Sequence, residues 1–249
     1  MTAAAPQLSI IIPSFNEETR LPATLDRIAA YIRTIHQNTE VIVVDDGSTD
    51  RTAAVAESFR EQIPQLRVLS NATNRGKGFS VRHGSLEARG EITLFTDADL
   101  SAPIEEADKL LAALKTCDVA IGSRAMNRKL IGVRESLFRE FAGIIFNKIV
   151  RLILRLPFVD TQCGFKAFRR GPCRIIFEQQ TIERFGFDPE LLYLARHHGL
   201  STVEVPVRWS HSPATKVSMM RDSVQMFLDV LIIRWNAIRR RYRRSGDKP

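Results

Sequence analysis

Acidic and polar motifs directly follow three apolar runs in the first hundred residues. PSFNE at 13–17 follows the run 8–12, DDGS at 45–48 follows the run 41–44, and DAD at 97–99 follows the run 92–96. Short β-branched runs bounded by turn residues are typical of buried parallel strands. Ligands of such sheets collect outside the carboxyl ends of the strands. The motifs are therefore expected to meet in one crevice, where carboxylates and amides suit a sugar or nucleotide with a divalent metal.

Asp97 and Asp99 are the strongest candidates for a metal site. Alternate residues of an extended strand face the same side, so the two carboxylates can converge on one object. Converging carboxylates repel each other unless a cation lies between them, and Mg²⁺ or Mn²⁺ with a diphosphate suits that position. Out of context such a triplet is more often a loop with two solvated acids. Its place after a strand, as the third such motif, favours the metal.

The other two candidate segments suit a nucleotide. Asp45 and Asp46 end the second apolar run, where an acid can accept hydrogen bonds from a base or ribose, and Ser48 can cap the following helix. NRGKG at 74–78 places two glycines and two cations before another helix, which suits contact between phosphate and backbone N–H groups. There is no Walker A pattern, and no GxGxxG follows the first strand, which argues against a dinucleotide enzyme.

The elements that must position these residues alternate between strand and helix in the first half. Strands are predicted at 8–13, 40–45, 66–69, 91–96 and 119–122, and helices at 18–37, 48–61, 79–89 and 103–115. This alternation indicates an α/β fold with a mostly parallel central sheet and flanking helices. In the second half, helices are predicted at 134–156, 187–198 and 217–240, and strands at 165–169 and 202–208.

The whole chain, residues 1–249, is predicted to form a single domain, because its length suits one large core and no linker is evident. Within it, 8–125 would bind a nucleotide sugar, and 126–249 would form an acceptor half with a basic C-terminal helix. Three cysteines without a CxxC pair favour buried, reduced thiols and a reducing compartment.

The formal charge of +8 comes in good part from the C-terminal arginines, which include RRRYRR at 239–244. Such a tail can bind nucleic acid or an anionic membrane surface, or be a solvated end. Binding of nucleic acid would leave the acidic motifs unexplained, so no nucleic-acid partner is expected. The amphipathic helices at 134–156 and 217–240 mix apolar faces with Arg and Lys, which favours an interfacial location. With no secretory signal and no spanning run, we expect a cytoplasmic protein, peripheral at the inner face of the membrane.

The order of seven motifs carries a more specific resemblance. PSFNEE, VVDDGSTD, NRGKG, TDADLSAP, GSR, DTQCGFKAF and FDPELLY follow one another along residues 13–193. In this order they resemble the family 2 inverting glycosyltransferases of GT-A fold, and within these the dolichyl-phosphate β-glucosyltransferases. DxD and DDGS are shared by the broad family. NRGKG, DTQCGFK and FDPELLY are narrower and indicate the polyprenyl-phosphate branch.

The resemblance implies a role for each matching residue. The nucleotide-sugar site would comprise Pro13, Phe15, Glu17, Asp45, Asp46, Lys77, Asp97, Ala98 and Asp99. Asp97 and Asp99 would hold Mg²⁺ or Mn²⁺. The acceptor and sugar pocket would comprise Arg124, Arg134, Asp160, Gln162 and Lys166, with the arginines at the acceptor phosphate. Asp188 falls where other members place a catalytic carboxylate, so the implied catalytic set is Asp97, Asp99, Arg124 and Asp188.

The implied activity is inverting, metal-dependent transfer of a hexose, glucose from UDP-glucose being favoured, to a polyprenyl monophosphate. That acceptor is already anionic at pH 7 because its second pKa is about 6, so it needs no general base. Asp188 would then orient groups. Three alternatives stay open: a polyprenyl-phosphate mannosyltransferase using GDP-mannose, a family 2 transferase with a saccharide acceptor and Asp188 as base, and a nucleotidyltransferase, whose usual Gly-rich loop is missing here.

Overall fold

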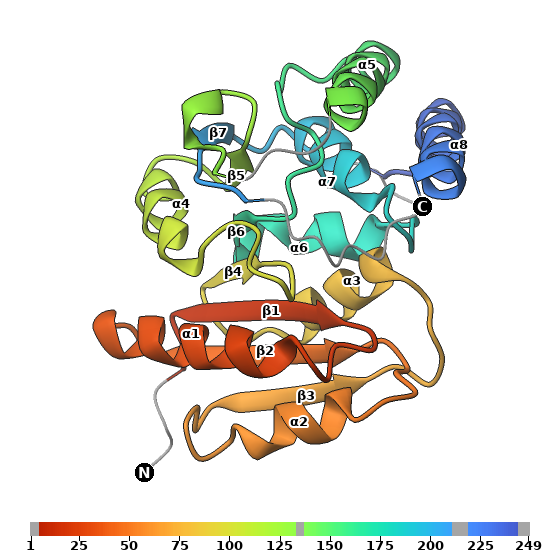
Figure 1. Cartoon of the computed structure of the whole chain (residues 1–249). Helices are drawn as coiled ribbons and strands as arrows, with labels where there is room; N and C mark the ends of the chain where they lie inside the picture. Colours follow the sequence, from red (N-terminus) through yellow and green to blue (C-terminus); the bar gives the residue numbers. More distant parts are fainter. Residues whose placement is uncertain (1–4, 133–136, 211–218, 244–249) are drawn as a thin grey trace.

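The computed structural model describes residues 5–132, 137–210 and 219–243 of the chain. Over these residues the centre is a seven-stranded sheet in the order β3-β2-β1-β4-β6-β5-β7 (Figure 1). Its strands are β1 Leu8–Ser14, β2 Thr39–Asp45, β3 Leu66–Ser70, β4 Ile92–Phe95, β5 Val119–Ser123, β6 Lys166–Arg169 and β7 Thr202–Pro206. The predicted α/β fold with a mostly parallel sheet is therefore confirmed.

Strand direction separates β6 from the rest of the sheet. β1 pairs in parallel with β2 and β4, β2 with β3, and β5 with β7. β6 lies antiparallel between β4 and β5. Every residue of β1 and β2 is buried, which explains why their sequences are nearly continuous apolar runs rather than alternating ones.

Eight α-helices cover the described sheet. They are α1 Leu21–Thr34, α2 Thr52–Ser58, α3 Lys77–Glu87, α4 Ala107–Ala113, α5 Leu137–Leu154, α6 Arg170–Gln179, α7 Phe187–His197 and α8 Met219–Ile238. Two short 3₁₀ helices, Ile104–Glu106 and Arg128–Leu130, precede α4 and α5. Six of the α-helices fall inside predicted ranges, α3 begins two residues before its predicted range, and α6 was not predicted.

The start of α2 differs from the prediction. The expectation that Ser48 caps this helix is wrong, because the helix begins at Thr52 and Ser48 Oγ accepts the backbone N–H of Asn16 at 2.9 Å. Asp50 takes over the local role, since its Oδ1 accepts the N–H of Thr52 at 2.9 Å. Ser48 therefore joins the end of β1 to the DDGS segment.

Two hydrophobic clusters fill the two faces of the sheet. Ile10 and Val43 belong to the cluster that includes α1 and α4, whereas Ile11 and Val44 belong to the cluster that includes α3, α6 and α7. Successive residues of one strand thus feed opposite layers, as the two-residue period of a strand requires. The three cysteines are free and buried, as predicted.

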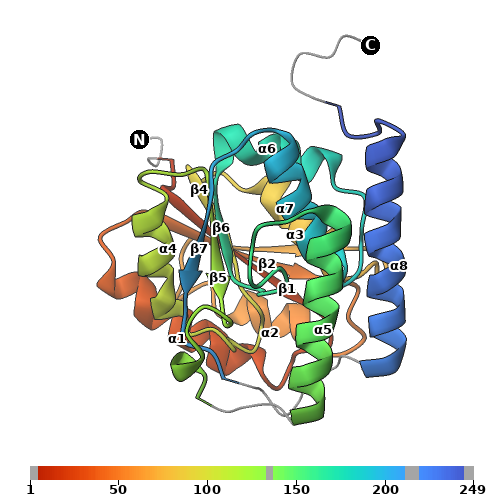
Figure 2. The same ribbon diagram turned by 90° about the horizontal axis from the view of Figure 1, so that it is seen from above.

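Helices α5 and α8 form an outer pair beside the second cluster, and they run side by side in both views (Figures 1 and 2). Their outward side chains are large and hydrophobic. We call this set the apolar face: Phe141, Ile144, Ile145, Ile149 and Leu152 of α5, with Val224, Phe227, Leu228, Leu231, Ile232, Trp235 and Ile238 of α8. Within the part of the chain that the structure describes, no helix has the length and apolarity needed to cross a bilayer.

Candidate active site

The three motifs meet at the carboxyl edge of the sheet, as predicted from their positions after strands. Ser14 at the end of β1 lies beside Asp45 at the end of β2. On the other side, Ile11 of β1 pairs with Phe95 of β4, and the N–H of Thr96 donates to the Ile11 carbonyl at 3.0 Å. Asp97 therefore emerges next to the PSFNE segment. Parallel pairing alone accounts for the convergence.

Asp97 and Asp99 are the open carboxylates of this edge. The Asp97 side chain is 34 % exposed, and its Oδ1 forms an ion pair with Lys77 Nζ. Asp99 is half-buried, and its Oδ1 accepts the N–H of Ser101 at 2.9 Å. A β-carbon at Gly164 would overlap the Asp97 carboxylate, so a larger residue there would have to displace this side chain. Ala98 lies between the two acids and is 8 % exposed. Its side chain has no polar atom, so it could offer a ligand only its backbone groups.

The donor set at this position fits a metal completed by substrate. Among the described residues, no group of three or more His, Cys, Asp or Glu side chains could hold a metal by itself. Mg²⁺ needs no such group, because it commonly binds through one or two carboxylates, water and substrate phosphates. Asp97 and Asp99 supply those two carboxylates. A nucleoside diphosphate and the ion would therefore bind together.

Lys77 at the start of α3 is the cation of this edge. Burial lowers the pKa of its ammonium, but the Asp97 and Asp188 carboxylates outweigh burial, and the net pKa is raised. Its Nζ also lies 5.9 Å from the centre of the Phe187 ring. Lys77 stays charged and can neutralise a phosphate oxygen beside Asp97.

Asp46 has a different environment from the one expected. It is 3 % exposed, and its carboxylate accepts hydrogen bonds from Asn71 Nδ2 at 2.7 Å, Arg75 N at 3.1 Å and Gly76 N at 2.7 Å. The expectation that the NRGKG amides hold a phosphate is therefore wrong for Arg75 and Gly76, whose N–H groups bind this carboxylate. Asp46 fixes the loop before α3, while its role beside a base or ribose stays a prediction.

The PSFNE and DDGS segments brace each other. The backbone N–H of Glu17 donates to Thr52 Oγ1 at 2.7 Å. The Glu17 carboxylate, 6 % exposed, binds both Nε and Nη2 of Arg20 at 2.6 Å. Asp45 is also buried, and its Oδ1 accepts the N–H of Ser48 at 3.2 Å. Pro13 is buried at the end of β1 and Phe15 is half-buried beyond it.

Lys166 and Asp188 form a fully buried ion pair behind Lys77. Lys166 Nζ contacts Asp188 Oδ1 and donates to the Cys163 carbonyl at 2.5 Å, and its side chain is 0 % exposed. Burial raises the pKa of Asp188 above its usual value, although the ammonium groups of Lys166 and Lys77 act in the opposite direction. Lys166 therefore braces the site, because it has no surface for a ligand. Two ammonium groups thus face the Asp188 carboxylate, and its role as base or orienting group stays a prediction.

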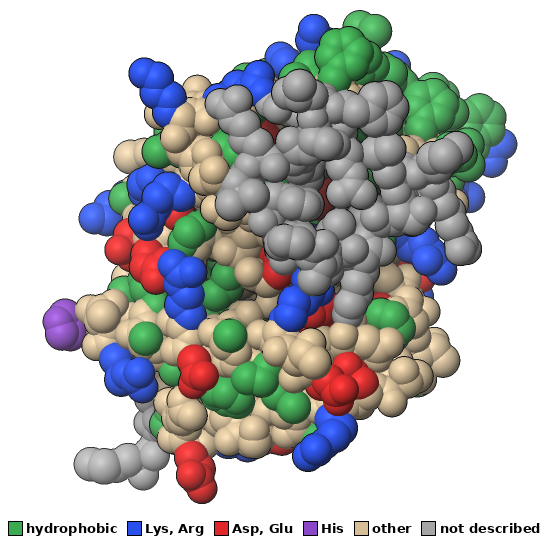
Figure 3. Space-filling model, viewed as in Figure 1, with side chains coloured by type: hydrophobic (Ala, Val, Ile, Leu, Met, Phe, Trp, Pro, Cys, Tyr) green, Lys and Arg blue, Asp and Glu red, His purple; other side chains and the backbone are tan. Residues whose placement is uncertain are grey.

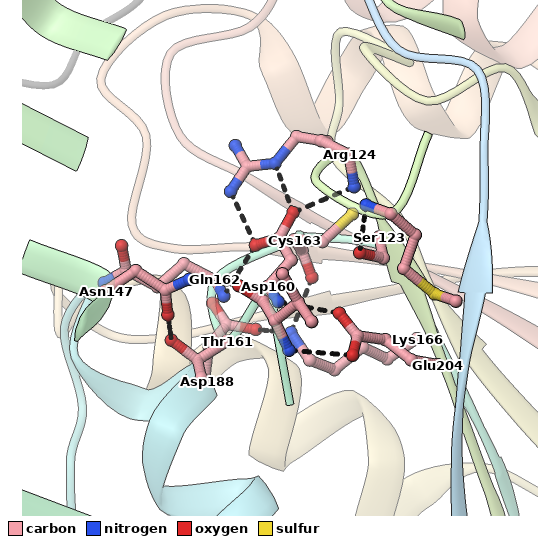
Figure 4. Close-up of polar contacts among 12 residues, drawn as sticks. Ser123, Arg124, Asn147, Asp160, Thr161, Gln162, Cys163, Lys166, Asp188 and Glu204 are labelled. Carbon is pink, nitrogen blue, oxygen red and sulfur yellow. Dashed lines mark hydrogen bonds and ion pairs between the residues drawn. The ribbon is translucent and has the colours of Figure 1, made fainter. Parts of the chain in front are cut away.

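Arg124 and Asp160 form a forked pair at the end of β5, seen in Figure 4. Arg124 Nε and Nη2 donate to the two oxygens of Asp160 at 2.7 and 2.9 Å, and the Arg124 N–H donates at 3.0 Å. Burial alone would raise the pKa of Asp160, but the Arg124 guanidinium outweighs it and holds the pKa at about 2. The Asp160 backbone in turn donates to Glu204 of β7 at 2.7 Å. The fork fixes the guanidinium, which also lies 5.5 Å from the Trp209 ring centre.

The remaining predicted residues divide between the site and its surroundings. Gln162 donates through its N–H to Asp160 at 3.2 Å, and its Nε2 lies 3.5 Å from Met226 Sδ of α8. Arg134 lies outside the described residues. Beside Asp97, a small hollow is lined by Thr96, Ala102, Cys163, Gly164, Phe165 and Trp209.

Two residues that organise this edge were missed by sequence reasoning. Asn71 binds Asp46 on one side and His83 Nδ1 on the other, at 2.8 Å. Glu190 in α7 is 0 % exposed and accepts the backbone N–H groups of Thr181 and Ile182. Nothing at Asn71 marks it in a single sequence. The spacing of Asp188 and Glu190 in FDPELLY is the only available signal for the second residue.

The chain is similar in sequence to known proteins over most of its length. The family model described as Glycosyl transferase family 2 matches residues 9–177. A dolichyl-phosphate beta-glucosyltransferase of Drosophila melanogaster is 40 % identical over 242 residues, which cover 91 % of this chain and 74 % of that protein. The enzyme of the same name from Mus musculus is 38 % identical over 92 % of this chain and 75 % of that protein. The enzyme of the same name from Saccharomyces cerevisiae is 33 % identical over 91 % of this chain and 74 % of that protein.

Solved structures show the same fold at lower sequence identity. Glucosyl-3-phosphoglycerate synthase from Mycobacterium tuberculosis, in complex with Mg²⁺ and UDP, superposes with a TM-score of 0.67. The two chains are 19 % identical, and the match covers 92 % of this chain and 79 % of that one. The complex of that enzyme with Mn²⁺, UDP and glucosyl-3-phosphoglycerate gives a TM-score of 0.66 at 18 % identity, over 92 % and 80 % of the chains. The predicted GT-A fold is confirmed by this likeness.

Proposed function

The chain belongs to glycosyl transferase family 2, and from that premise we propose that it transfers glucose from UDP-glucose to a dolichyl-type polyprenyl phosphate. The observation that carries the proposal is identity of 33–40 % to dolichyl-phosphate beta-glucosyltransferases over about nine-tenths of the chain. The open carboxylates Asp97 and Asp99 beside Lys77 support a diphosphate donor at the carboxyl edge of the sheet. The division into a donor half, 8–125, and an acceptor half, 126–249, is part of this proposal.

The proposed reaction is a single displacement with inversion. A phosphate oxygen of the acceptor attacks the anomeric carbon of glucose, the bond from that carbon to the UDP oxygen breaks, and UDP leaves with the bonding electrons. The acceptor carries its negative charge at pH 7 because its second pKa is about 6. No proton has to be removed, so a buried Asp188 held by Lys166 is compatible with catalysis. Asp188 instead orients the ammonium groups around it.

Negative charge develops on the leaving diphosphate. Lys77, and a metal ion held by Asp97 and Asp99, would neutralise it. Lys77 is held beside Asp97 and stays protonated, so it can place positive charge on that group. Mg²⁺ or Mn²⁺ on Asp97 and Asp99, when bound, would add Lewis-acid neutralisation of the same oxygens. The relatives in solved structures were obtained with Mn²⁺ or Mg²⁺ and UDP, which supports metal use here.

Arg124 is the proposed contact for the acceptor phosphate. Its fork with Asp160 fixes the guanidinium at the end of β5, and planar guanidinium groups suit phosphate oxygens. Arg124 would therefore bind the acceptor phosphate while its guanidinium stays hydrogen-bonded to Asp160. Because Asp160 fixes the guanidinium, the bound phosphate could shift only a little. Arg134 would assist it. Asp160 and Lys166 brace the pocket rather than contact the sugar, because both are at least 96 % buried.

The lipid tail of such an acceptor requires an apolar surface near the site, and we assign the apolar face of α5 and α8 to a membrane surface. In Figure 3 hydrophobic side chains gather over α5 and α8, with Lys and Arg next to them. The spacing of Val224, Phe227, Leu231 and Ile238 keeps one side of α8 apolar, as in helices that lie in the membrane plane. Arg239, 4.4 Å above the Trp235 ring, begins the basic cluster. An anionic leaflet complements that charge.

Release of the nucleoside diphosphate, UDP or GDP, from a panel of nucleotide sugars tests the activity. UDP-glucose and GDP-mannose would be supplied with Mg²⁺ or Mn²⁺, with and without a short polyprenyl phosphate, and with Asp99→Asn as the matched inactive enzyme. We expect nucleotide release from UDP-glucose only when the lipid phosphate is present. Release without the lipid phosphate would overturn the acceptor, and release from GDP-mannose alone would overturn the donor.

Sedimentation with liposomes tests the membrane assignment. Replacing Arg239, Arg240 and Arg243 together by Gln should weaken binding to anionic liposomes at least about tenfold, since each Arg contributes roughly 1 kcal/mol near such a surface. The matched control replaces Arg33, Arg60 and Lys115, which are also exposed. Equal sedimentation of both triple variants would rule the assignment out.

A further inference from the structure

A single loop, residues 180–186, lies between α8 and the first turn of α3. It joins α6 to α7, so it crosses from one helix of the second hydrophobic cluster to the next. On one side it contacts α8, the helix with most of the apolar face. On its other side it contacts the segment that carries Lys77. Loop 180–186 is therefore a mechanical link between the apolar face and the donor site.

The contacts on the α3 side are specific. Gln180 Nε2 donates to the Gly78 carbonyl at 2.8 Å, and the N–H of Phe79 donates to the Glu183 carbonyl at 2.9 Å. A β-carbon at Gly76 would lie 2.6 Å from that same carbonyl, and Gly76 has a φ of +112°, so glycine is required twice over. The first turn of α3 thus rests directly on the loop. Lys77 lies inside this turn.

The contacts on the other side converge on one buried carboxylate. Glu190 of α7 accepts the N–H of Thr181 at 3.0 Å, the N–H of Ile182 at 2.8 Å and the Thr181 hydroxyl at 2.6 Å. Tyr242, just beyond α8, donates its hydroxyl to the same carboxylate at 2.7 Å and is 3 % exposed. Asn236 of α8 adds a bond from Nδ2 to Thr181 Oγ1 at 3.2 Å. Glu190 therefore holds the loop, and Tyr242 holds Glu190.

Because the Glu190 carboxylate is buried, a conformation in which it lost one of its hydrogen-bond donors would cost free energy. A buried carboxylate that loses a donor keeps its desolvation cost, so each of its hydrogen bonds resists displacement. Glu190 also lies two residues from Asp188 on the same helix. The Asp188 carboxylate faces Lys77 and Lys166. A shift of Glu190 would move both the loop and the start of α7.

We propose that Glu190 and Tyr242 are positioning residues of the donor site, which fix loop 180–186 and thereby hold Lys77 beside Asp97. Neither residue has to touch the nucleotide. The proposal rests on the proposed donor site at Lys77 and Asp97. It assigns the residues after α8 a part in nucleotide binding, which their distance along the chain from the acidic motifs does not suggest.

The test uses the full chain with Tyr242→Phe, which removes only the hydroxyl, and Glu190→Gln. Tyr193→Phe is the matched control, because it removes a hydroxyl from the α7 ring that lies 5.8 Å from the Tyr242 ring. Titration calorimetry with UDP and Mn²⁺ should show affinity lowered about three- to tenfold in Tyr242→Phe and more in Glu190→Gln, as expected for lost bonds to a carboxylate. The KM for UDP-glucose should rise and kcat should fall, because Lys77 also faces the charge that develops on the leaving diphosphate, while the acceptor KM should stay unchanged.

Hydrogen exchange without ligand supplies a second readout. The amide of Phe79 should exchange faster in Tyr242→Phe than in wild type or Tyr193→Phe, because its acceptor lies on the loop. A lowered Tm with unchanged UDP affinity and unchanged Phe79 exchange would overturn the proposal in favour of a purely structural role. If wild type binds no UDP, the donor site itself is wrong, while the exchange of Phe79 still reports on the link through the loop.

Discussion

Two acidic motifs at the same sheet edge have opposite environments. In DDGS, after β2, Asp45 and Asp46 are 6 % and 3 % exposed. Their oxygens accept hydrogen bonds from Ser48, Asn71, Arg75 and Gly76. In DAD, after β4, the Asp97 side chain is 34 % exposed, and its carboxylate forms an ion pair with the ammonium group of Lys77. The protein's own donors close the first motif, whereas the second stays open to solvent.

The difference shows that two similar acidic motifs, each after a parallel strand, can have different roles, one structural and one in ligand binding. A carboxylate saturated by backbone amides is a rigid anchor for a loop, because each bond resists displacement. A carboxylate that faces water and one ammonium group can exchange that partner for a metal and a diphosphate at little cost. Asp46 therefore shapes the site, and Asp97 with Asp99 is available to the ligand.

The largest effect should follow from the open motif. Asp99→Asn and Asp97→Asn are expected to lower kcat at least about 10³-fold, or roughly 4 kcal/mol, because they remove charge that binds the metal and donor. The Tm should change little, since both side chains are partly exposed. Steady-state UDP release and thermal unfolding measure the two quantities. The control is Asp26→Asn on the exposed side of α1, and a loss of activity that only follows unfolding would break the comparison.

The closed motif should respond in the reverse way. Asp46→Ala leaves the donors of Asn71, Arg75 and Gly76 without their acceptor, so the free energy of unfolding should fall by about 3 kcal/mol. Urea denaturation followed by Trp fluorescence gives this value. Folded enzyme should keep kcat and show a higher KM for the donor. Full stability combined with complete loss of kcat would place Asp46 with the open acids.

A pH titration extends the comparison to Asp160, another closed acid. Its pKa falls from 3.8 to about 2 on folding, so the carboxylate stabilises the folded state at pH values above 3.8. That contribution, about 2 kcal/mol, is lost as pH falls through about 2. Unfolding free energies measured in urea between pH 5 and pH 2 should decrease more steeply in wild type than in Asp160→Asn. Parallel curves would show that the Arg124 fork does not hold the carboxylate.

The smallest effect is expected at the hydroxyl of DDGS. Ser48→Ala removes the acceptor for the Asn16 N–H and should lower the free energy of unfolding by about 1 kcal/mol. Both kcat and KM should stay at wild-type values, because Ser48 acts through the loop alone. A change in KM without a change in stability would mean that this hydroxyl meets the nucleotide.

Much of the fold can be predicted from the sequence, because it depends on patterns among residues that are close together along the chain. The buried runs of β1 and β2 and the turn residues after them predict both the strands and the edge where the motifs meet. Helix α6 was missed because Gly171 and Pro172 suggest a break, although proline is tolerated in a first helical turn. The antiparallel direction of β6 has no local signal, since pairing partners lie far away in sequence.

The site could be located but not divided into anchors and ligands from the sequence. Asp46 and Asp97 occupy equivalent places after strands, and only the tertiary position of Gly76 shows that one is already bonded. Likewise, the matching motif does not show that Lys166 is fully buried beneath Asp188. Burial and partner identity depend on packing between distant segments, which residue types at a single position do not encode.

The antiparallel strand β6 also dictates an order of assembly during synthesis. The first 95 residues contain β1 to β4, and the edge of β4 that β6 covers in the folded sheet has no native partner until β6 emerges. β5 emerges next, but its partners in the folded sheet are β6 and β7, so the native pairing of β4 has to wait for Lys166–Arg169. An unpaired edge is a template for association with other chains. The stage of synthesis between the completion of β4 and the arrival of β6 is therefore the one in which this edge is open to association with other chains.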